Sequence, residues 1–178
     1  TEFLIASITI LLTVCFLNTA IADTAEKIDT KVDWTLEQLY NLEGGKDFAE
    51  KAKGLLIMPN VGKGALIIGI EYGEGALRID GKTVDYYKLS AGSIGFQIGG
   101  EAKDIVIAFM TDEALEQFRT SKNWGAGIDA NVAVVKAGGG GTLSNITAKE
   151  PVQAILFDVK GLIFDLSLKG AKFSKLEK

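Results

Sequence analysis

Few residues of this chain could carry catalysis or bind a metal, and histidine is not among them. The 178 residues contain no His and one cysteine, Cys15, which lies in an apolar N-terminal run. Histidine is the commonest general base and transition-metal ligand. The composition therefore excludes disulfides, thiol catalysis and zinc sites from the rest of the chain. We predict no metal and no cofactor, because no calcium-binding loop is recognisable either.

Two glycine-containing segments could in principle hold phosphate. Residues 76–83 fit a relaxed phosphate-loop pattern, which requires a buried strand before the glycine loop and a helix after it. Strand patterns flank Asp80-Gly81 on both sides, so this dipeptide predicts a hairpin turn instead. No helix pattern follows the run Gly138–Gly141, and we interpret that run as a mobile loop.

Carboxylate pairs also occur, but they do not define a catalytic site. Glu71 with Glu74 and Asp112 with Glu113 are pairs that 23 acidic residues produce by chance. Neither pair shows a glycosidase or calcium-site pattern. An enzyme is therefore the third of three hypotheses, behind a lipid-binding domain and a structural or protein-interaction module.

The N-terminal segment predicts export. Residues 3–22 carry no charge, which is typical of a membrane span or a secretion signal. Ala20-Ile21-Ala22 has the small-x-small form of a signal-peptidase site, so we expect a signal peptide at 1–22 and a single domain at 23–178. A retained anchor is the alternative. We expect an exported protein, periplasmic or membrane-associated. The net charge of −4 argues against a nucleic-acid partner.

The apolar pattern of residues 67–110 predicts a glycine-rich antiparallel sheet. Residues 94–98 alternate as a half-buried strand does. Further on, Ile105, Ile107 and Phe109 face one side, and apolar residues also face the other side. A strand that is apolar on both faces is typical of the centre of a sheet.

Three helices are expected around this sheet. Residues 24–43 place apolar side chains at spacings of three and four, and we expect this helix to dock on the sheet. A role at a membrane surface is the alternative. Asp47 and Glu50 resemble a capping box for a short second helix, and Thr111 can cap a third.

Shorter strands and a basic tail complete the pattern. We expect a strand at 55–58 that ends at Pro59-Asn60, a strand at 128–135 with Ile128 on its apolar side, and a hairpin at 156–168 that turns at Lys160-Gly161. Residues 169–178 hold four lysines and one acid, which is typical of a solvated end and could also face anionic lipid.

Taken in order, these segments resemble the SYLF domain family of lipid-binding and actin-regulating domains, most closely its secreted bacterial branch. The matching stretches are 51–61 (KAKGLLIMPNV), 73–79 (GEGALRI), 92–115 (GSIGFQIGGEAKDIVIAFMTDEAL), 127–134 (GIDANVAV) and 160–170 (KGLIFDLSLKG).

The resemblance implies an α+β fold, with N-terminal helices packed on a strongly curved, barrel-like antiparallel β-sheet and one helix inserted near 111–121. It also implies binding to phospholipid head groups, which are phosphoinositides in eukaryotic members, some of which bind actin. Lys51, Lys53 and Lys160 lie in matching motifs. Asp158 stands where many members have Arg.

The first hypothesis is therefore a non-enzymatic domain that binds anionic phospholipid at the bacterial envelope membrane, with a protein partner as the alternative. The candidate lipid-binding residues are the lysines of the matching motifs and of the tail, and the apolar face of the first helix: Lys51, Lys53, Lys160, Lys169, Lys172, Lys175, Ile28, Val32, Leu36 and Leu39.

Overall fold

The computed structural model of the chain describes residues 23–63, 70–92, 102–134, 143, 149–158, 161–162 and 168–178. The helices in these parts are α2 (Ala25–Asn41), α3 (Gly45–Lys51) and α4 (Asp112–Thr120). The strands are β1 (Gly54–Lys63), β2 (Ile70–Ile79), β3 (Lys82–Gly92), β4 (Lys103–Phe109), β5 (Trp124–Gly125), β6 (Ala133–Val134), β7 (Val152–Asp158), β8 (Gly161–Leu162) and β9 (Lys172–Leu176).

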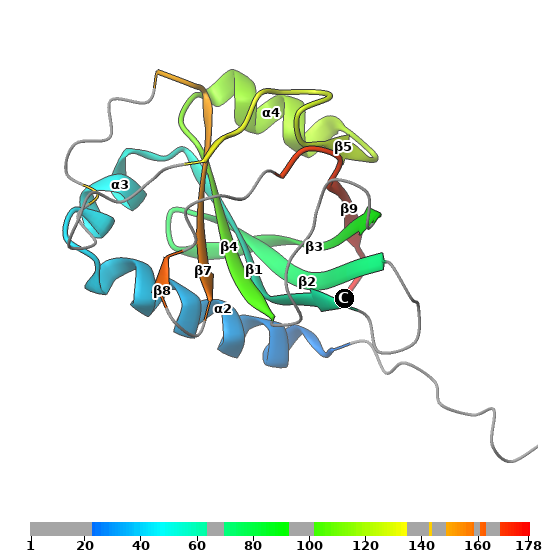
Figure 1. Ribbon diagram of the computed structural model, residues 1–178, viewed down its shortest axis with the longest axis horizontal. Coiled ribbons are helices and arrows are strands. Elements are labelled where there is room, and N and C mark those ends of the chain that lie inside the picture. The colour runs from blue at the N-terminus through cyan, green and yellow to red at the C-terminus, as the bar shows by residue number, and fades with distance from the viewer. Residues whose placement is uncertain are drawn as a thin grey trace, which may run out of the picture.

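All of these strands belong to one sheet, which curls strongly on itself (Figure 1). The order is β5-β9-β3-β2-β1-β4-β7-β6, with β8 paired to β7. The described pairings are antiparallel except for β6 with β7, which run parallel. The structure thus confirms the expected α+β class with a curved sheet and helices packed on it.

Strand β4 lies between β1 and β7 inside the sheet, and all seven of its residues are buried. Ile105, Ile107 and Phe109 belong to one apolar cluster, whereas Val106 and Ala108 belong to a second cluster. Because neighbouring residues of a strand point to opposite faces, the two clusters occupy the two faces of the sheet. The prediction of a central strand with two apolar faces is confirmed.

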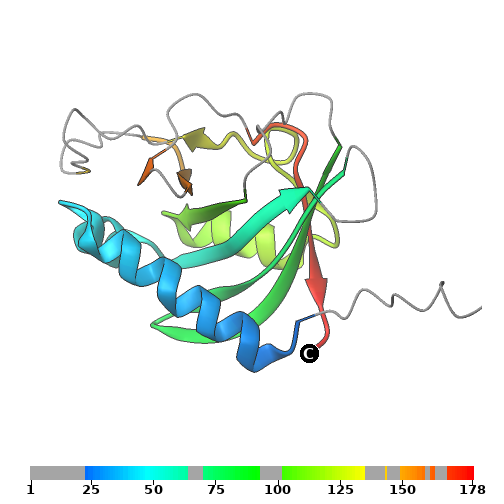
Figure 2. The same cartoon turned by 60° about the horizontal axis from the view of Figure 1, so that its bottom comes forward.

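One cluster contains α2, and we call that side of the sheet the α2 face. Figure 2 shows α2 lying along the sheet, where its apolar residues pack against β1, β2, β4 and β7. Thr24 caps the helix, accepting a hydrogen bond from Lys27 N at 3.3 Å. The expected docking of this helix on the sheet is therefore confirmed.

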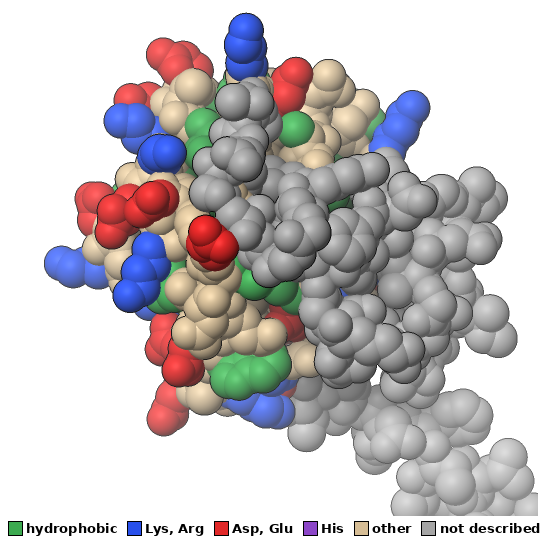
Figure 3. Space-filling view, turned by 60° about the vertical axis from the view of Figure 1, so that its left-hand side comes forward, with side chains coloured by type: hydrophobic (Ala, Val, Ile, Leu, Met, Phe, Trp, Pro, Cys, Tyr) green, Lys and Arg blue, Asp and Glu red, His purple; other side chains and the backbone are tan. Residues whose placement is uncertain are grey.

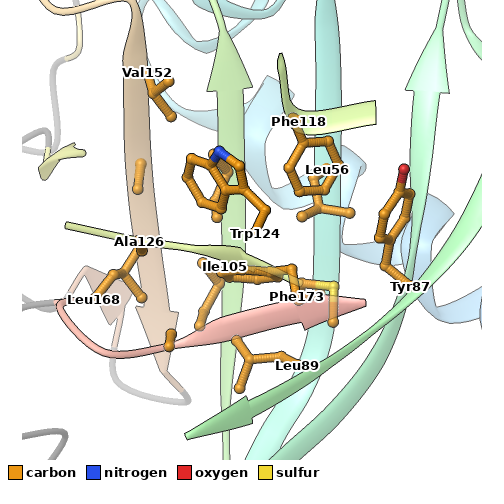
Figure 4. Packing of buried hydrophobic residues seen from close by; sticks show 14 of the residues in the cluster. Leu56, Tyr87, Leu89, Ile105, Phe118, Trp124, Ala126, Val152, Leu168 and Phe173 are labelled. Atoms are coloured by element: carbon orange, nitrogen blue, oxygen red, sulfur yellow. The ribbon is translucent and has the colours of Figure 1, made fainter. Parts of the chain in front are cut away.

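The other cluster contains α4, and we call that side the α4 face. Phe118 of α4 lies 4.6 Å from Phe109 and 4.7 Å from Tyr87, measured between ring centroids, and 5.4 Å from Trp124. Figure 4 shows Tyr87, Phe118 and Trp124 close to Leu56 and Phe173 over the strands of the sheet. Thr111 caps α4 as predicted, accepting a hydrogen bond from Ala114 N at 3.2 Å.

The hairpin prediction for residues 76–83 is confirmed. Asp80 and Gly81 join β2 to β3 with φ values of 51° and 73°, which are left-handed conformations that suit a two-residue hairpin turn. No helix follows Gly81, so this segment is not a phosphate loop. Residues 94–98 and Gly138–Gly141 lie outside the described residues.

Four local predictions were wrong or incomplete. Strand β1 continues through Pro59-Asn60, where a register shift absorbs the left-handed Asn60 (φ 52°). Gly44, not Asp47, is the N-cap of α3. Residues 127–129 form a turn before the short strand β6, and Ile128 is exposed instead of facing the core. The tail, finally, contains strand β9, which pairs with β3.

Candidate functional site

Lys53 of the motif at 51–61 borders a groove of about 600 Å³ between α2, α3 and the β2–β3 turn, whereas Lys51 lines a separate pocket with Met110 and Glu150. Lys46, Lys53 and Arg78 line it, but so do the acidic residues Glu50 and Asp80. Lys53 also lies 3.7 Å from the Asp112 carboxylate. In Figure 3, which brings the α3 side forward, acidic and basic side chains alternate over the described surface.

Arg78 of this groove serves mainly to hold α2. Its Nη2 lies 2.7 Å from Asp33 and 3.4 Å from Asp29. Its Nε is buried and has no acceptor among the described residues. Because two carboxylates neutralise the guanidinium, the groove is only weakly basic.

Hydrogen bonds to two acidic residues fix α2 to the sheet. Asp29 accepts hydrogen bonds from Thr83 Oγ1 at 2.7 Å and from Tyr86 OH at 2.8 Å. Burial, together with this bond to Asp29, raises the pKa of Tyr86. Further along the sheet, buried Asp104 accepts from Thr35 Oγ1 at 2.9 Å and from Asn60 N at 2.7 Å.

The four apolar candidates on α2 are consequently buried. Ile28, Val32, Leu36 and Leu39 are each 9% exposed or less. In this docked arrangement they cannot contact lipid. Contact would require α2 to leave the sheet and break the bonds to Asp29 and Asp104, so their role in lipid binding stays a prediction.

Because β9 pairs with β3, the lysines of the tail lie on different faces of the sheet. Lys172 lies opposite Ser90 on the α2 face of the sheet, and its side chain is exposed there. Lys175 lies opposite Tyr87 on the α4 face and pairs with Asp85 at 3.1 Å.

The last lysine of the tail holds the C-terminus against the start of α2. Lys178 Nζ lies 3.1 Å from Glu74 and donates a hydrogen bond to the Asp23 carbonyl oxygen at 2.6 Å. Its side chain is only 11% exposed. Lys178 therefore ties the tail to β2 and to the N-terminal end of the described chain, and has little charge to offer a partner.

The candidate lysines do not form one site. Lys51 and Lys53 are exposed near α3, and Lys169 and Lys172 are exposed at the β9 end, on the opposite side of the molecule in Figure 1. Lys160 lies outside the described residues. These assignments remain predictions, and Lys169 and Lys172 are the exposed candidates at the β9 end, whereas Lys175 pairs with Asp85.

A buried ion pair was missed by the sequence analysis. Lys103 at the start of β4 and Glu71 of β2 lie 3.2 Å apart, with side chains 0% and 4% exposed. Burial lowers the pKa of Lys103 to about 8, although the Glu71 carboxylate opposes the shift. A charged residue at the head of an apolar strand was the available signal, but its partner lies 32 residues away.

In the part of the chain that the structure describes, no cluster of three or more Cys, Asp or Glu side chains could hold a metal ion. The helices found there are also too short or too polar to cross a bilayer. What the described residues present is an α+β domain with a tightly docked helix, a weakly basic groove and two exposed lysines at the β9 end.

Comparison with known proteins identifies the family. A family model described as "Ysc84: Las17-binding protein actin regulator" matches residues 90–178, which run from the end of β3 to the C-terminus. The chain belongs to this family, in agreement with the resemblance to SYLF domains. No curated protein matches the chain.

Proposed function

We propose that this protein is a non-enzymatic domain that binds anionic phospholipid at the surface of the bacterial envelope membrane. Membership of the family carries the proposal, because the SYLF resemblance implies lipid binding and the matched segment includes β9 with its lysines. The absence of histidine from the sequence, and of cysteine beyond Cys15, supports a binding function over catalysis.

The charges of the tail give an estimate of the free energy with which the protein binds an anionic membrane. Each lysine near an anionic surface contributes roughly 1 kcal/mol, an effect that decays within a Debye length of roughly 8 Å at physiological salt. Lys169 and Lys172 are exposed at the β9 end, and we assign most of the attraction to them because of that exposure. Two lysines contribute about 2 kcal/mol, which requires an apolar contact in addition for stable binding.

A protein-interaction module is the second candidate function. The description of the family as a Las17-binding actin regulator favours it, since that description names a protein partner. Under this alternative the protein would bind a polypeptide, and its affinity for vesicles would not depend on the charge of the lipid.

Vesicle cosedimentation distinguishes the two functions. We expect the purified protein to bind vesicles of phosphatidylcholine mixed with phosphatidylglycerol about 30-fold more tightly than vesicles of phosphatidylcholine alone. The preference should decline as salt is added, because screening weakens the lysine contribution.

Residues 3–22 carry no charge, so they should bind charged and uncharged vesicles equally well. Their contribution therefore does not change the ratio of the two affinities. Equal binding to both types at low salt, or binding to neither, would disprove the lipid proposal and leave the interaction module.

A further inference from the structure

The loop between β5 and β6 has a fixed conformation. Gly127 N donates to Ala130 O at 2.8 Å, and Asp129 N donates to Gly125 O at 2.9 Å. The Asp129 carboxylate accepts a hydrogen bond from Gly125 N at 2.5 Å. Gly127 has φ +73°, which a residue with a side chain rarely adopts. The turn is therefore determined by its own residues and holds Ile128 in one orientation.

The same loop is attached to its neighbours. Ala126 N donates to Ala171 O at 2.9 Å, and Gly170 N donates to Ala126 O at 3.1 Å, which joins the loop to the segment before β9. On the other side, Gln117 of α4 donates from Nε2 to Asp129 O at 3.0 Å. The position of Ile128 relative to the tail lysines is thus set by hydrogen bonds on both sides.

Ile128 points into solvent from this loop. Its exposure of 67% is the largest among the big hydrophobic side chains of the described residues. Ile128 lies over Gly125 and occupies space that a larger residue at position 125 would fill. A Cβ built at Gly125 would stand 3.2 Å from the Ile128 Cβ. An exposed apolar side chain on a surface is ordinary, so its significance depends on what surrounds it.

Two lysines lie beside the loop that carries Ile128, and a third lies farther away on the same face of the sheet. Gly125 pairs with Lys172 across β5 and β9, so the Lys172 side chain emerges on the face that Ile128 covers. The stem of Lys169 packs beside Gly127, with its Cγ 3.1 Å from a Cβ built there. Lys88 of β3 lies diagonally across from Lys172 on the same face, at a Cα–Cα distance of about 7–8 Å, and directly opposite Glu74 of β2.

We propose that Ile128 and these lysines form the membrane-contacting surface of the protein, with Ile128 entering the boundary between head groups and acyl chains. The inference rests on the proposed function and names the surface that performs it. Lys88, Lys169 and Lys172 would contact lipid phosphates, while α2 stays docked. Ile128 supplies the apolar contact that binding through the tail lysines alone would not provide.

The shape of this surface favours a bilayer over a folded protein. A specific protein interface typically buries roughly 1,200–2,000 Å² with an apolar centre. Here one isoleucine protrudes beside two lysines, and the same loop contains one carboxylate, Asp129, which accepts a hydrogen bond from Gly125 N. An anionic bilayer offers an apolar interior to Ile128 and negatively charged phosphates to the lysines near it.

Paired substitutions test the inference on vesicles of phosphatidylcholine mixed with phosphatidylglycerol. We expect Ile128→Gln to weaken binding by about tenfold or more, because a buried isoleucine contributes at least that factor. Lys172→Gln should weaken it about fivefold. Ile128→Trp should strengthen binding, since tryptophan favours the membrane interface.

Matched controls come from the far end of β3. Val84 is 42% exposed and Lys82 is also exposed. Lys82 stands eight residues from Ser90, the partner of Lys172, and so about 26 Å away along the strand. Val84→Gln and Lys82→Gln should leave vesicle binding unchanged within about twofold. Circular dichroism should show all five variants folded, because every substituted side chain is exposed.

The outcomes separate the inference from the proposed function. If the wild-type protein does not prefer anionic vesicles, the proposed function fails. If it prefers them but the Ile128→Gln and Lys172→Gln variants bind as it does, only this surface is wrong. The surface is also wrong if the Val84→Gln and Lys82→Gln controls lose as much binding as the variants at positions 128 and 172.

Discussion

Lys103→Met is expected to lower the free energy of unfolding by about 3–5 kcal/mol. Lys103 and Glu71 form an ion pair whose side chains are almost completely buried. Removing the lysine alone leaves the Glu71 carboxylate inside the sheet without its cation, and an uncompensated buried charge is strongly destabilising. Urea unfolding of the variant and the wild-type protein measures the difference.

The double variant Lys103→Met/Glu71→Leu is the matched control. Replacing a buried ion pair by apolar side chains of similar volume is often neutral or stabilising. We therefore expect the double variant to recover most of the stability that the single variant loses. If both variants lost the same amount, packing at position 103 and not its charge would explain the effect.

The pH dependence of stability should change with the pair. The pKa of Lys103 falls from 10.5 to about 8 on folding because the side chain is buried. Between these values the unfolded chain binds more protons, so this group makes stability rise with pH. Below pH 8, Lys103 is charged in the folded protein as well, and the full free-energy cost of burying its charge lowers the stability. The double variant should lack this part of the rise.

Phe118→Ala is also expected to destabilise the protein by about 3–5 kcal/mol, the range for truncating a buried aromatic residue. Phe118 is 0% exposed and contacts the rings of Tyr87, Phe109, Trp124 and Phe173. It is the main anchor of α4, whose Gln117 holds the Ile128 loop through Asp129 O. Thermal unfolding followed by circular dichroism measures the loss.

Phe118→Leu provides the comparison, because it keeps an apolar side chain of nearly the right volume and should lose less than half as much stability. A loss below about 1 kcal/mol for Phe118→Ala would contradict the account of α4 packing, since it would mean that the helix is not held by this cluster.

Local patterns were enough to predict the central features of the fold. Residues 105–110 alternate between two apolar faces, and β4 is indeed buried on both. Asp80-Gly81 forms a turn because Gly adopts a positive φ easily. Thr111 caps α4 through a bond to an amide only three residues away. Each of these features depends on residues close together in the sequence.

Features that depend on distant residues could not be predicted in the same way. β9 forms because the tail reaches β3, and its five residues, KFSKL, give only a weak strand signal. The alternation at 128–135 suggested a strand, but hydrogen bonds within residues 125–130 make a turn and expose Ile128. The tail lysines looked equivalent until Asp85 and Glu74 were seen to pair with two of them.

Fluorescence from a probe at position 128 tests the central claim most directly. Single cysteines at 128 and at 84, each in a Cys15→Ser background, can carry an environment-sensitive dye. Anionic vesicles should shift the emission of the dye at 128 to the blue, as an apolar surrounding does, and leave the dye at 84 unchanged. Vesicle binding without a shift at 128, or with an equal shift at 84, would contradict docking through Ile128 and the lysines around it.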